Sequence, residues 1–169
     1  MPYPQISAGQ RITASLLNSM LPATVVKSAD QQSTSNALTN DPELLLPVVG
    51  GATYRGELVL FFSANVNDDL NYAWATPAGT VGRRGIIGPD PTATATVDLT
   101  ALQDRVSGAL NTQFRVGGAG GSHKMLIERL VVIPGATGTL QLQWGQGTGD
   151  TANPTTVYAN SHLTLTRVA

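Results

Sequence analysis

A glycine-rich run at residues 117–124, Gly-Gly-Ala-Gly-Gly-Ser-His-Lys, comes closest in this chain to a phosphate-binding loop. Such a loop needs G-x-x-x-x-G-K-[ST], because backbone N–H groups and a lysine surround the phosphates. Here His123 precedes Lys124, and Met125 stands where Ser or Thr is needed. The dinucleotide pattern G-x-G-x-x-G also fails, since His123 takes the place of its third glycine. We therefore interpret the run as a loop between strands.

The two histidines, His123 and His162, are the candidate bases. Nucleophilic catalysis needs a base beside a Ser or Thr, and a carboxylate that orients the base. Ser161 precedes His162, but neighbouring residues of a strand point to opposite faces, so this pair is poorly placed. The two histidines also lack the spacing of a metal site on a helix. We predict no catalytic residue and no enzymatic activity.

Asn65-Val-Asn-Asp-Asp69 is an acidic segment whose oxygen atoms could bind Ca²⁺. It lacks the D-x-[DN]-x-[DN]-G pattern and a bidentate glutamate. A turn between strands explains the same residues, because Asn and Asp tolerate turn backbones. We therefore predict neither a bound metal nor another cofactor.

Tyr72, Trp74 and Trp144 could form a platform for a sugar ring. However, Tyr72 and Trp74 share one face of their segment, and Trp144 lies on the apolar side of its own. Packing in the core is therefore the favoured interpretation. Aromatic residues make up 5% of the chain, which is few for a carbohydrate module or for a surface that stacks single-stranded nucleic acid.

The composition excludes several classes of function. There is no cysteine, which rules out disulfides, thiolate zinc sites and thiol nucleophiles. Lys and Arg total 10 against 11 Asp and Glu, so no basic surplus indicates a nucleic-acid or membrane partner. The longest apolar stretch, Leu58–Phe62, is too short to span a membrane, and the N-terminus lacks the pattern of a signal peptide. Charged residues are 12% of the chain, which suits a protein packed among other chains.

Short apolar segments separated by turn residues predict an all-β, jelly-roll-like antiparallel β-sandwich over residues 23–169. In Leu140–Trp144, leucine and tryptophan alternate with glutamine at the period of a half-buried strand. Leu163–Thr166 repeats the pattern, and Ala95–Leu99 and Gln113–Val116 follow it more weakly. The predicted core consists of Leu60, Phe62, Leu130, Val132, Leu140, Leu142, Trp144, Leu163 and Leu165.

Two segments, residues 54–62 and 125–133, are apolar more continuously. We predict that both are central strands covered on both faces. Pro47 lies inside a strand-like run and predicts an edge strand, because proline has no N–H for a ladder. Residues 83–91 are expected to be a long excursion between strands, and Gln103–Leu110 a possible helical turn.

Residues 1–22 differ from the rest and are expected to form an extended N-terminal arm with one short helix. Thr13 or Ser15 can cap that helix, and Pro22 ends it. The predicted partner-anchoring residues share one helical face, and they are Ile12, Leu16, Leu17 and Met20. A helix of about ten residues is marginal in water by itself. We therefore predict that this stripe lies on a partner chain or on the sandwich.

Several segments resemble small virion structural proteins of tailed phages that infect actinobacteria. They are Ala8–Pro22 followed by Thr24–Lys27, Asp41–Pro47, Ala52–Tyr54, Gly138–Trp144 and Leu163–Ala169. The middle of the chain, residues 65–121, has no part in the resemblance. The resemblance implies a structural role in a virion without enzymatic activity, and it does not decide between head and tail.

The leading hypothesis is a phage head (capsid) decoration protein on the exterior of the virion, made in the host cytoplasm. We expect a homo-oligomer, a trimer in the first instance, whose arm binds the major capsid protein or other virion proteins. A tail fibre or minor tail protein is the alternative within this class. A glycan-binding β-sandwich module is the alternative from another class, since jelly rolls also host lectins. Aromatic side chains in an open groove would favour the glycan-binding module, and buried ones the structural protein.

Overall fold

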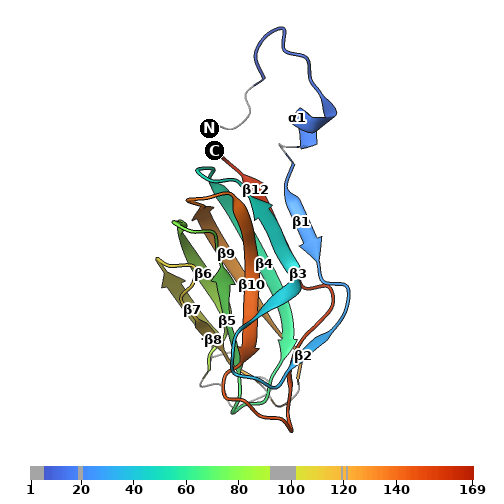
Figure 1. The fold of residues 1–169 in the computed structure, drawn as a ribbon. Coiled ribbons are helices and arrows are strands. Elements are labelled where there is room, and N and C mark those ends of the chain that lie inside the picture. Colours follow the sequence, from blue (N-terminus) through green and yellow to red (C-terminus); the bar gives the residue numbers. More distant parts are fainter. Residues whose placement is uncertain (1–5, 19–20, 92–101, 119, 121) are drawn as a thin grey trace.

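The computed structural model describes residues 6–18, 21–91, 102–118, 120 and 122–169, and these form an antiparallel β-sandwich (Figure 1). The strands of the larger sheet are β1 (Ala23–Val26), β2 (Gln31–Ser33), β4 (Tyr54–Ser63), β6 (Val81–Pro89), β7 (Leu102–Ser107), β9 (Lys124–Ile133), β11 (Thr155–Val157) and β12 (His162–Arg167). The smaller sheet consists of β3 (Thr39–Val48), β5 (Leu70–Ala75), β8 (Phe114–Val116) and β10 (Gly138–Gln146). The predicted all-β sandwich is confirmed.

The strand order gives the sandwich its jelly-roll connectivity. Strands β3 to β6 pair in turn with β10 to β7, so that β3 pairs β10, β4 pairs β9, β5 pairs β8 and β6 pairs β7, all antiparallel. These four antiparallel pairs form one long hairpin that folds over on itself. The folding places β3-β10-β5-β8 in one sheet and β4-β9-β6-β7 in the other. Such a two-sheet order is the jelly-roll arrangement. Strands β12 and β1 extend the larger sheet beyond β4.

The core lies between the two sheets, where alternate residues of each strand point inward. All nine residues predicted for the core are buried, with at most 3% of any one exposed. Fully burying a leucine or phenylalanine side chain contributes roughly 1.5–3 kcal/mol. Because the predicted residues of β10 and β12 are all buried, their period-two pattern identified the inward face correctly.

The prediction for the two apolar segments is half right. Strands β4 and β9 are central in the larger sheet, but their outward face is not covered by any described element. Their inward residues are buried, while Arg55, Arg129 and Val131 on the outward face are exposed. The alternation escaped notice because Val59, Ile127 and other apolar residues also occupy outward positions. The predicted edge strand is confirmed, since β3 with Pro47 forms an edge of the smaller sheet.

Two other local predictions are wrong. Residues 83–91, expected to be an excursion, form most of strand β6, and Gln103–Leu110, considered for a helical turn, provides most of strand β7. The two strands pair with each other from Arg84 opposite Ser107 to Pro89 opposite Leu102. Arginine and glycine obscured the strand pattern of β6, although Arg84 is fully buried. The weak strand expected at Ala95–Leu99 lies outside the described residues.

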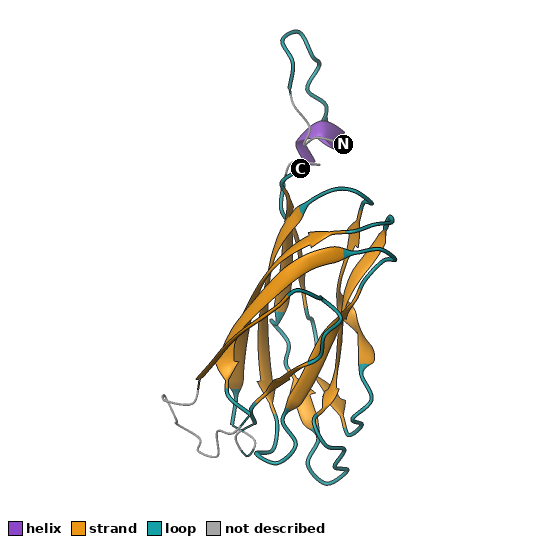
Figure 2. Cartoon of the chain, turned by 90° about the vertical axis from the view of Figure 1, so that its left-hand side faces the viewer, coloured by secondary structure: helices purple, strands orange, loops and turns teal. Residues whose placement is uncertain are grey.

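The arm leads away from one end of the sandwich, ahead of β1 (Figure 2). It contains the helix α1 (Ala14–Asn18), which is five residues long, so the predicted helix of about ten residues is not seen. The Thr13 hydroxyl accepts a hydrogen bond of 3.2 Å from the Leu16 amide, as an N-cap does. No described helix is long and apolar enough to cross a membrane.

Candidate interaction surface

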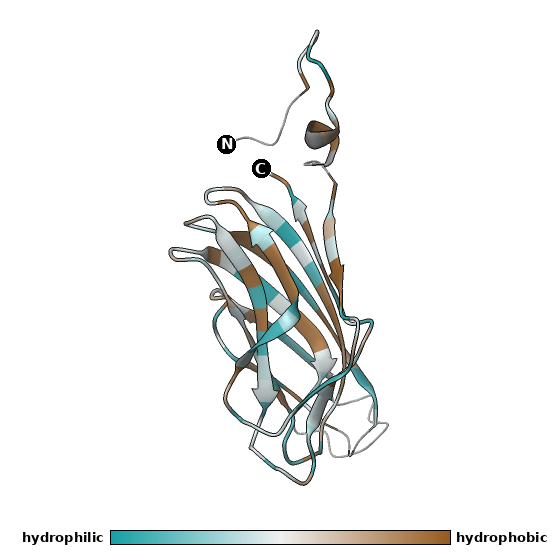
Figure 3. Cartoon of the chain, turned by 45° about the vertical axis from the view of Figure 1, so that its right-hand side comes forward, coloured by the Kyte–Doolittle hydropathy of each residue, from teal (hydrophilic) through white to brown (hydrophobic). Residues whose placement is uncertain are grey.

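The predicted anchoring residues belong to the arm, and Figure 3 colours parts of the arm, α1 among them, as hydrophobic. Ile12 is 54% and Leu17 50% exposed, and Leu16 is half-buried. Leu21, just before β1, is 63% exposed, whereas Met20 lies outside the described residues. A cluster of exposed apolar side chains is typical of a surface that meets a partner.

The described members of the predicted stripe, Ile12, Leu16 and Leu17, do not all lie on one helix. Leu16 and Leu17 belong to α1, but Ile12 precedes it. The backbone bonds found in the arm are local, such as the 3.0 Å bond from the Leu17 amide to the Thr13 carbonyl. A short helix forms few hydrogen bonds. Without a supporting surface, these bonds do not offset the free-energy cost of nucleating the helix, so a longer helix does not form.

Between the sheets, a buried cluster around Glu128 explains two of the aromatic residues. Glu128 on β9 accepts hydrogen bonds from the Tyr72 hydroxyl at 2.6 Å and from the Trp74 indole nitrogen at 2.7 Å. Glu128 Oε2, the oxygen that accepts from Tyr72, also accepts a 2.8 Å bond from Arg84 on β6. Burial raises the pKa of Glu128, while the nearby Arg84 charge and these hydrogen bonds oppose that shift. Burial likewise raises the pKa of Tyr72 well above its ordinary range, and the charge of Glu128 adds to the effect.

A second buried carboxylate, Asp41 on β3, repeats the arrangement around Trp144. The Trp144 indole nitrogen donates to Asp41 Oδ2 at 3.0 Å, and Lys27 Nζ donates to the same oxygen at 2.9 Å. Asp41 Oδ1 accepts the backbone amides of Glu43 and Leu44. All three aromatic residues considered for a sugar platform are thus buried and bonded inside the sandwich, as the core interpretation predicted.

Gly118 of the glycine-rich run packs against the acidic segment Asn65–Asp69. Asp69 accepts a 2.8 Å bond from the Gly118 amide and a 2.6 Å bond from Arg115 Nε, and burial raises its pKa. A Cβ added at Gly118 would lie 2.2 Å from the Asn65 carbonyl oxygen, so this close backbone approach requires glycine. Within the described part of the chain, no group of three or more His, Asp or Glu side chains is arranged to hold a metal.

The candidate bases have other partners. The His123 ring packs on Tyr158 with 4.2 Å between ring centroids, and His162 Nδ1 lies 3.1 Å from the Asn160 carbonyl. The Ser161 hydroxyl donates to the Tyr158 carbonyl at 2.8 Å instead of meeting His162. Ser161 is buried and lies ahead of β12, which begins at His162.

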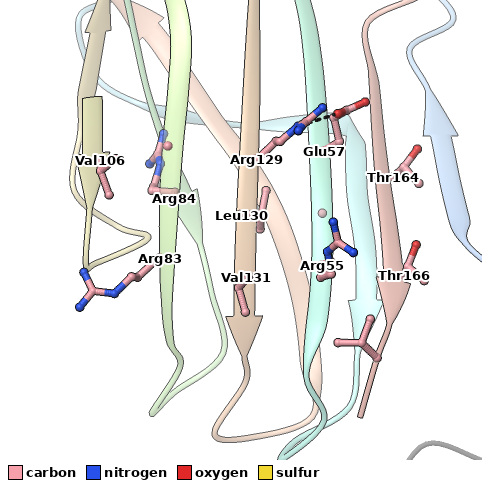
Figure 4. A pocket seen from close by; sticks show the side chains of 13 residues that line it. Arg55, Glu57, Arg83, Arg84, Val106, Arg129, Leu130, Val131, Thr164 and Thr166 are labelled. Carbon is pink, nitrogen blue, oxygen red and sulfur yellow. Dashed lines mark hydrogen bonds and ion pairs between the residues drawn. The ribbon is translucent and has the colours of Figure 1, made fainter. Parts of the chain in front are cut away.

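Sequence reasoning missed the outward face of the larger sheet. Cross-strand pairing places Arg55 of β4 and Arg83 of β6 on either side of Val131 of β9 (Figure 4). The outward positions of residues 54–62 and 125–133, read at period two, would have revealed the arginines.

No family model matches the chain, and no curated protein matches it. Among solved structures, the chain is similar to one from infectious bursal disease virus, Gx strain, with 15% identity and a TM-score of 0.20, covering 87% of this chain and 41% of that one. It is also similar to the infectious bursal disease virus VP2 subviral particle, with 11% identity and a TM-score of 0.21, covering 99% of this chain and 46% of that one. This chain thus spans less than half the length of those proteins. The jelly-roll assignment rests on the strand order of this chain itself.

Proposed function

We propose that this protein is a structural component of a phage virion that works by binding other virion proteins through its arm. The observation that carries the proposal is the arm itself, which leaves the sandwich with Ile12, Leu17 and Leu21 exposed. The resemblance of the arm and of several strands to small virion proteins supports the same role. The finer proposal is a head decoration protein that binds the major capsid protein on the exterior of the particle.

The energetics of the arm favour an external partner. Fully burying each leucine or isoleucine contributes roughly 1.5–3 kcal/mol. Ordering the backbone costs about 1–2 kcal/mol per residue, so a short arm becomes ordered when a preformed surface covers its apolar side chains. A neighbouring subunit or the capsid shell provides such a surface. We therefore propose a homotrimer whose arms attach it to the shell.

Binding, and not catalysis, is the proposed mode of action. This part of the proposal rests on where the candidate chemical groups lie. Glu128 and Asp41 hold the sandwich together with their hydrogen bonds directed inward. Tyr72, Trp74 and Trp144 are buried, which favours the structural protein over the glycan-binding module.

The decisive experiment locates the chain in purified particles. Gold labelling of an epitope-tagged chain, with mass spectrometry of the same particles, is expected to place it on the head. Particles assembled with a chain lacking residues 1–22, or with Leu16→Asp and Leu17→Asp, should have lost the label. Val81→Asp changes an exposed valine of β6 in the same way and should retain it.

Each result decides one part of the proposal. Label on the tail would overturn the decoration assignment, and absence of the chain from particles would overturn the virion role. Wild-type occupancy of the arm-deleted chain would overturn anchoring by the arm. Light scattering of the purified protein tests the trimer, whose mass should be three times the 17.6 kDa of one chain.

A further inference from the structure

The outward face of the larger sheet carries a hollow of about 660 Å³. It extends across β12, β4, β9, β6 and β7, on the side of the sheet that faces away from the core (Figure 4). Arginines, small apolar residues and threonine hydroxyls line it. This mixture of cations and apolar side chains differs from an ordinary solvated strand face, which is polar.

The strand register arranges the lining in rows. Arg55 and Arg83 are both cross-strand partners of Val131, so the three residues lie side by side across three strands. In the next row Arg129 pairs with Gly85, and Gly85 pairs with Val106. Gly85 has no side chain, which leaves space between its exposed neighbours and deepens the hollow beside Val131.

Two of these cations are uncompensated. Arg129 forms an ion pair with Glu57, with 3.2 Å between Nε and Oε2. Arg55 and Arg83 form no ion pair or hydrogen bond with any residue that the structure describes. The hollow therefore carries excess positive charge on a chain whose formal net charge is −1. Charge complementarity requires an acidic occupant.

We infer that this hollow binds an extended acidic segment of a partner protein, which presents two carboxylates on the same face. Strands lie about 4.8 Å apart, so Arg55 and Arg83 are roughly 10 Å apart across the sheet. Carboxylates two residues apart in an extended peptide lie on the same face, about 7 Å apart, and the long arginine side chains can span the remaining difference. Each guanidinium can hold a carboxylate through two parallel hydrogen bonds. Val131, which lies between the two arginines, then contacts the peptide between the two acids.

A peptide fits this surface better than a sugar or a nucleic acid does. None of the lining residues, all of them described, carries an aromatic ring on which a sugar or a base could stack. The hydroxyl of Thr166 on β12 can instead donate a hydrogen bond to a peptide carbonyl group. The inference does not depend on the virion role, because it rests on the sheet face and not on the arm.

The test uses the full-length protein and a fluorescent peptide in which aspartate alternates with valine. A second peptide with asparagine in place of each aspartate isolates the charge. We expect fluorescence anisotropy to show tighter binding of the aspartate peptide and loss of that preference at about 1 M salt, where the Debye length is about 3 Å. Arg55→Gln with Arg83→Gln should weaken binding about fivefold, the effect of losing two exposed ion pairs.

The matched control is Arg11→Gln with Arg105→Gln, which removes the same charge from exposed arginines that do not line the hollow. This control should bind the aspartate peptide within about twofold of the wild type. Equal binding of the two peptides, or equal loss in control and test variants, would overturn the inference. Tighter binding of polygalacturonate or of a single-stranded oligonucleotide than of the aspartate peptide would overturn the assignment to a protein partner. Circular dichroism melts confirm that every variant is folded.

Discussion

Arg84 and Glu128 form an ion pair in which neither side chain is exposed to solvent, with 2.8 Å between Nη2 and Oε2. The pair joins β6 to β9, and the hydrogen bonds of Glu128 to Tyr72 and Trp74 extend it to β5 in the opposite sheet. The Arg84 guanidinium also lies 4.2 Å from the centre of the Phe114 ring on β8. One charged pair thus connects four strands and both layers of the sandwich.

Glu128→Gln should lower the free energy of unfolding by about 3–5 kcal/mol, because it leaves the buried Arg84 without its counter-charge. Denaturant unfolding at a fixed protein concentration measures the loss. Glu57→Gln is the matched control, since Glu57 pairs with Arg129 at the surface. That change should cost at most about 1 kcal/mol. Equal costs for the two variants would contradict the role assigned to the buried pair.

The stability of the protein should fall in acid through Glu43. Hydrogen bonds from the Ser28 hydroxyl and amide, with a smaller contribution from Lys27, lower the pKa of Glu43 from 4.5 to about 2. A carboxyl with a lowered folded-state pKa stabilises the protein above its unfolded pKa, and that contribution is lost as the pH falls through the folded value. The wild type should therefore lose more thermal stability than Glu43→Gln between pH 4.5 and pH 2. Parallel melting curves over that range would contradict the prediction.

Gly118→Ala should destabilise the protein by about 1–3 kcal/mol, the usual cost of overpacking. The added methyl group would meet the Asn65 carbonyl oxygen at 2.2 Å, and backbone atoms cannot rotate away as a side chain can. Gly108→Ala is the control, because the atom nearest to the added Cβ would be the mobile end of the Arg83 side chain, at 3.8 Å. Thermal melts of the two variants should differ clearly, with Gly108→Ala close to the wild type.

Leu17→Asp should leave the sandwich as stable as the wild type, within about 0.5 kcal/mol, because Leu17 is half exposed on the arm. Leu142→Ala, by contrast, empties a fully buried site on β10 and should cost about 2–5 kcal/mol. Denaturant unfolding of both variants separates the arm from the core. A large loss for Leu17→Asp would show that the arm is part of the folded domain.

The sequence allowed the sandwich and its inward face to be predicted, because burial imposes a period of two that Leu140, Leu142 and Trp144 follow without interruption. The prediction from sequence failed where charged residues lie in the interior of the sandwich. Arg84 and Glu128 are charged residues inside apolar strands, and nothing in their local pattern reveals that they meet across β6 and β9. Pairing of distant segments creates this cluster, so no window of sequence contains it.

The outward face shows the opposite difficulty. Val131 and Ile127 point to the outside, but their apolar character suggested strands covered on both sides. The extent of the helix was also overestimated, since the spacing of Ile12, Leu16 and Leu17 fits a helix that an unsupported arm does not complete. In both cases the apolar pattern marks a surface that no described element of this chain covers.

The place of β12 in the larger sheet has a consequence for synthesis. Strand β1 is hydrogen-bonded to β12 alone among the described strands, with Ala23 opposite Leu165 and Val26 opposite His162. During translation β1 emerges early but gains its ladder only after residue 167 has left the ribosome, about 140 residues later at roughly 5–20 residues per second. Until then, the segment β1 that joins the arm to the sandwich has no strand to pair with. A nascent chain therefore has no paired β1 to fix the position of the arm, and the arm takes its place at the end of the sandwich only when the sheet is complete.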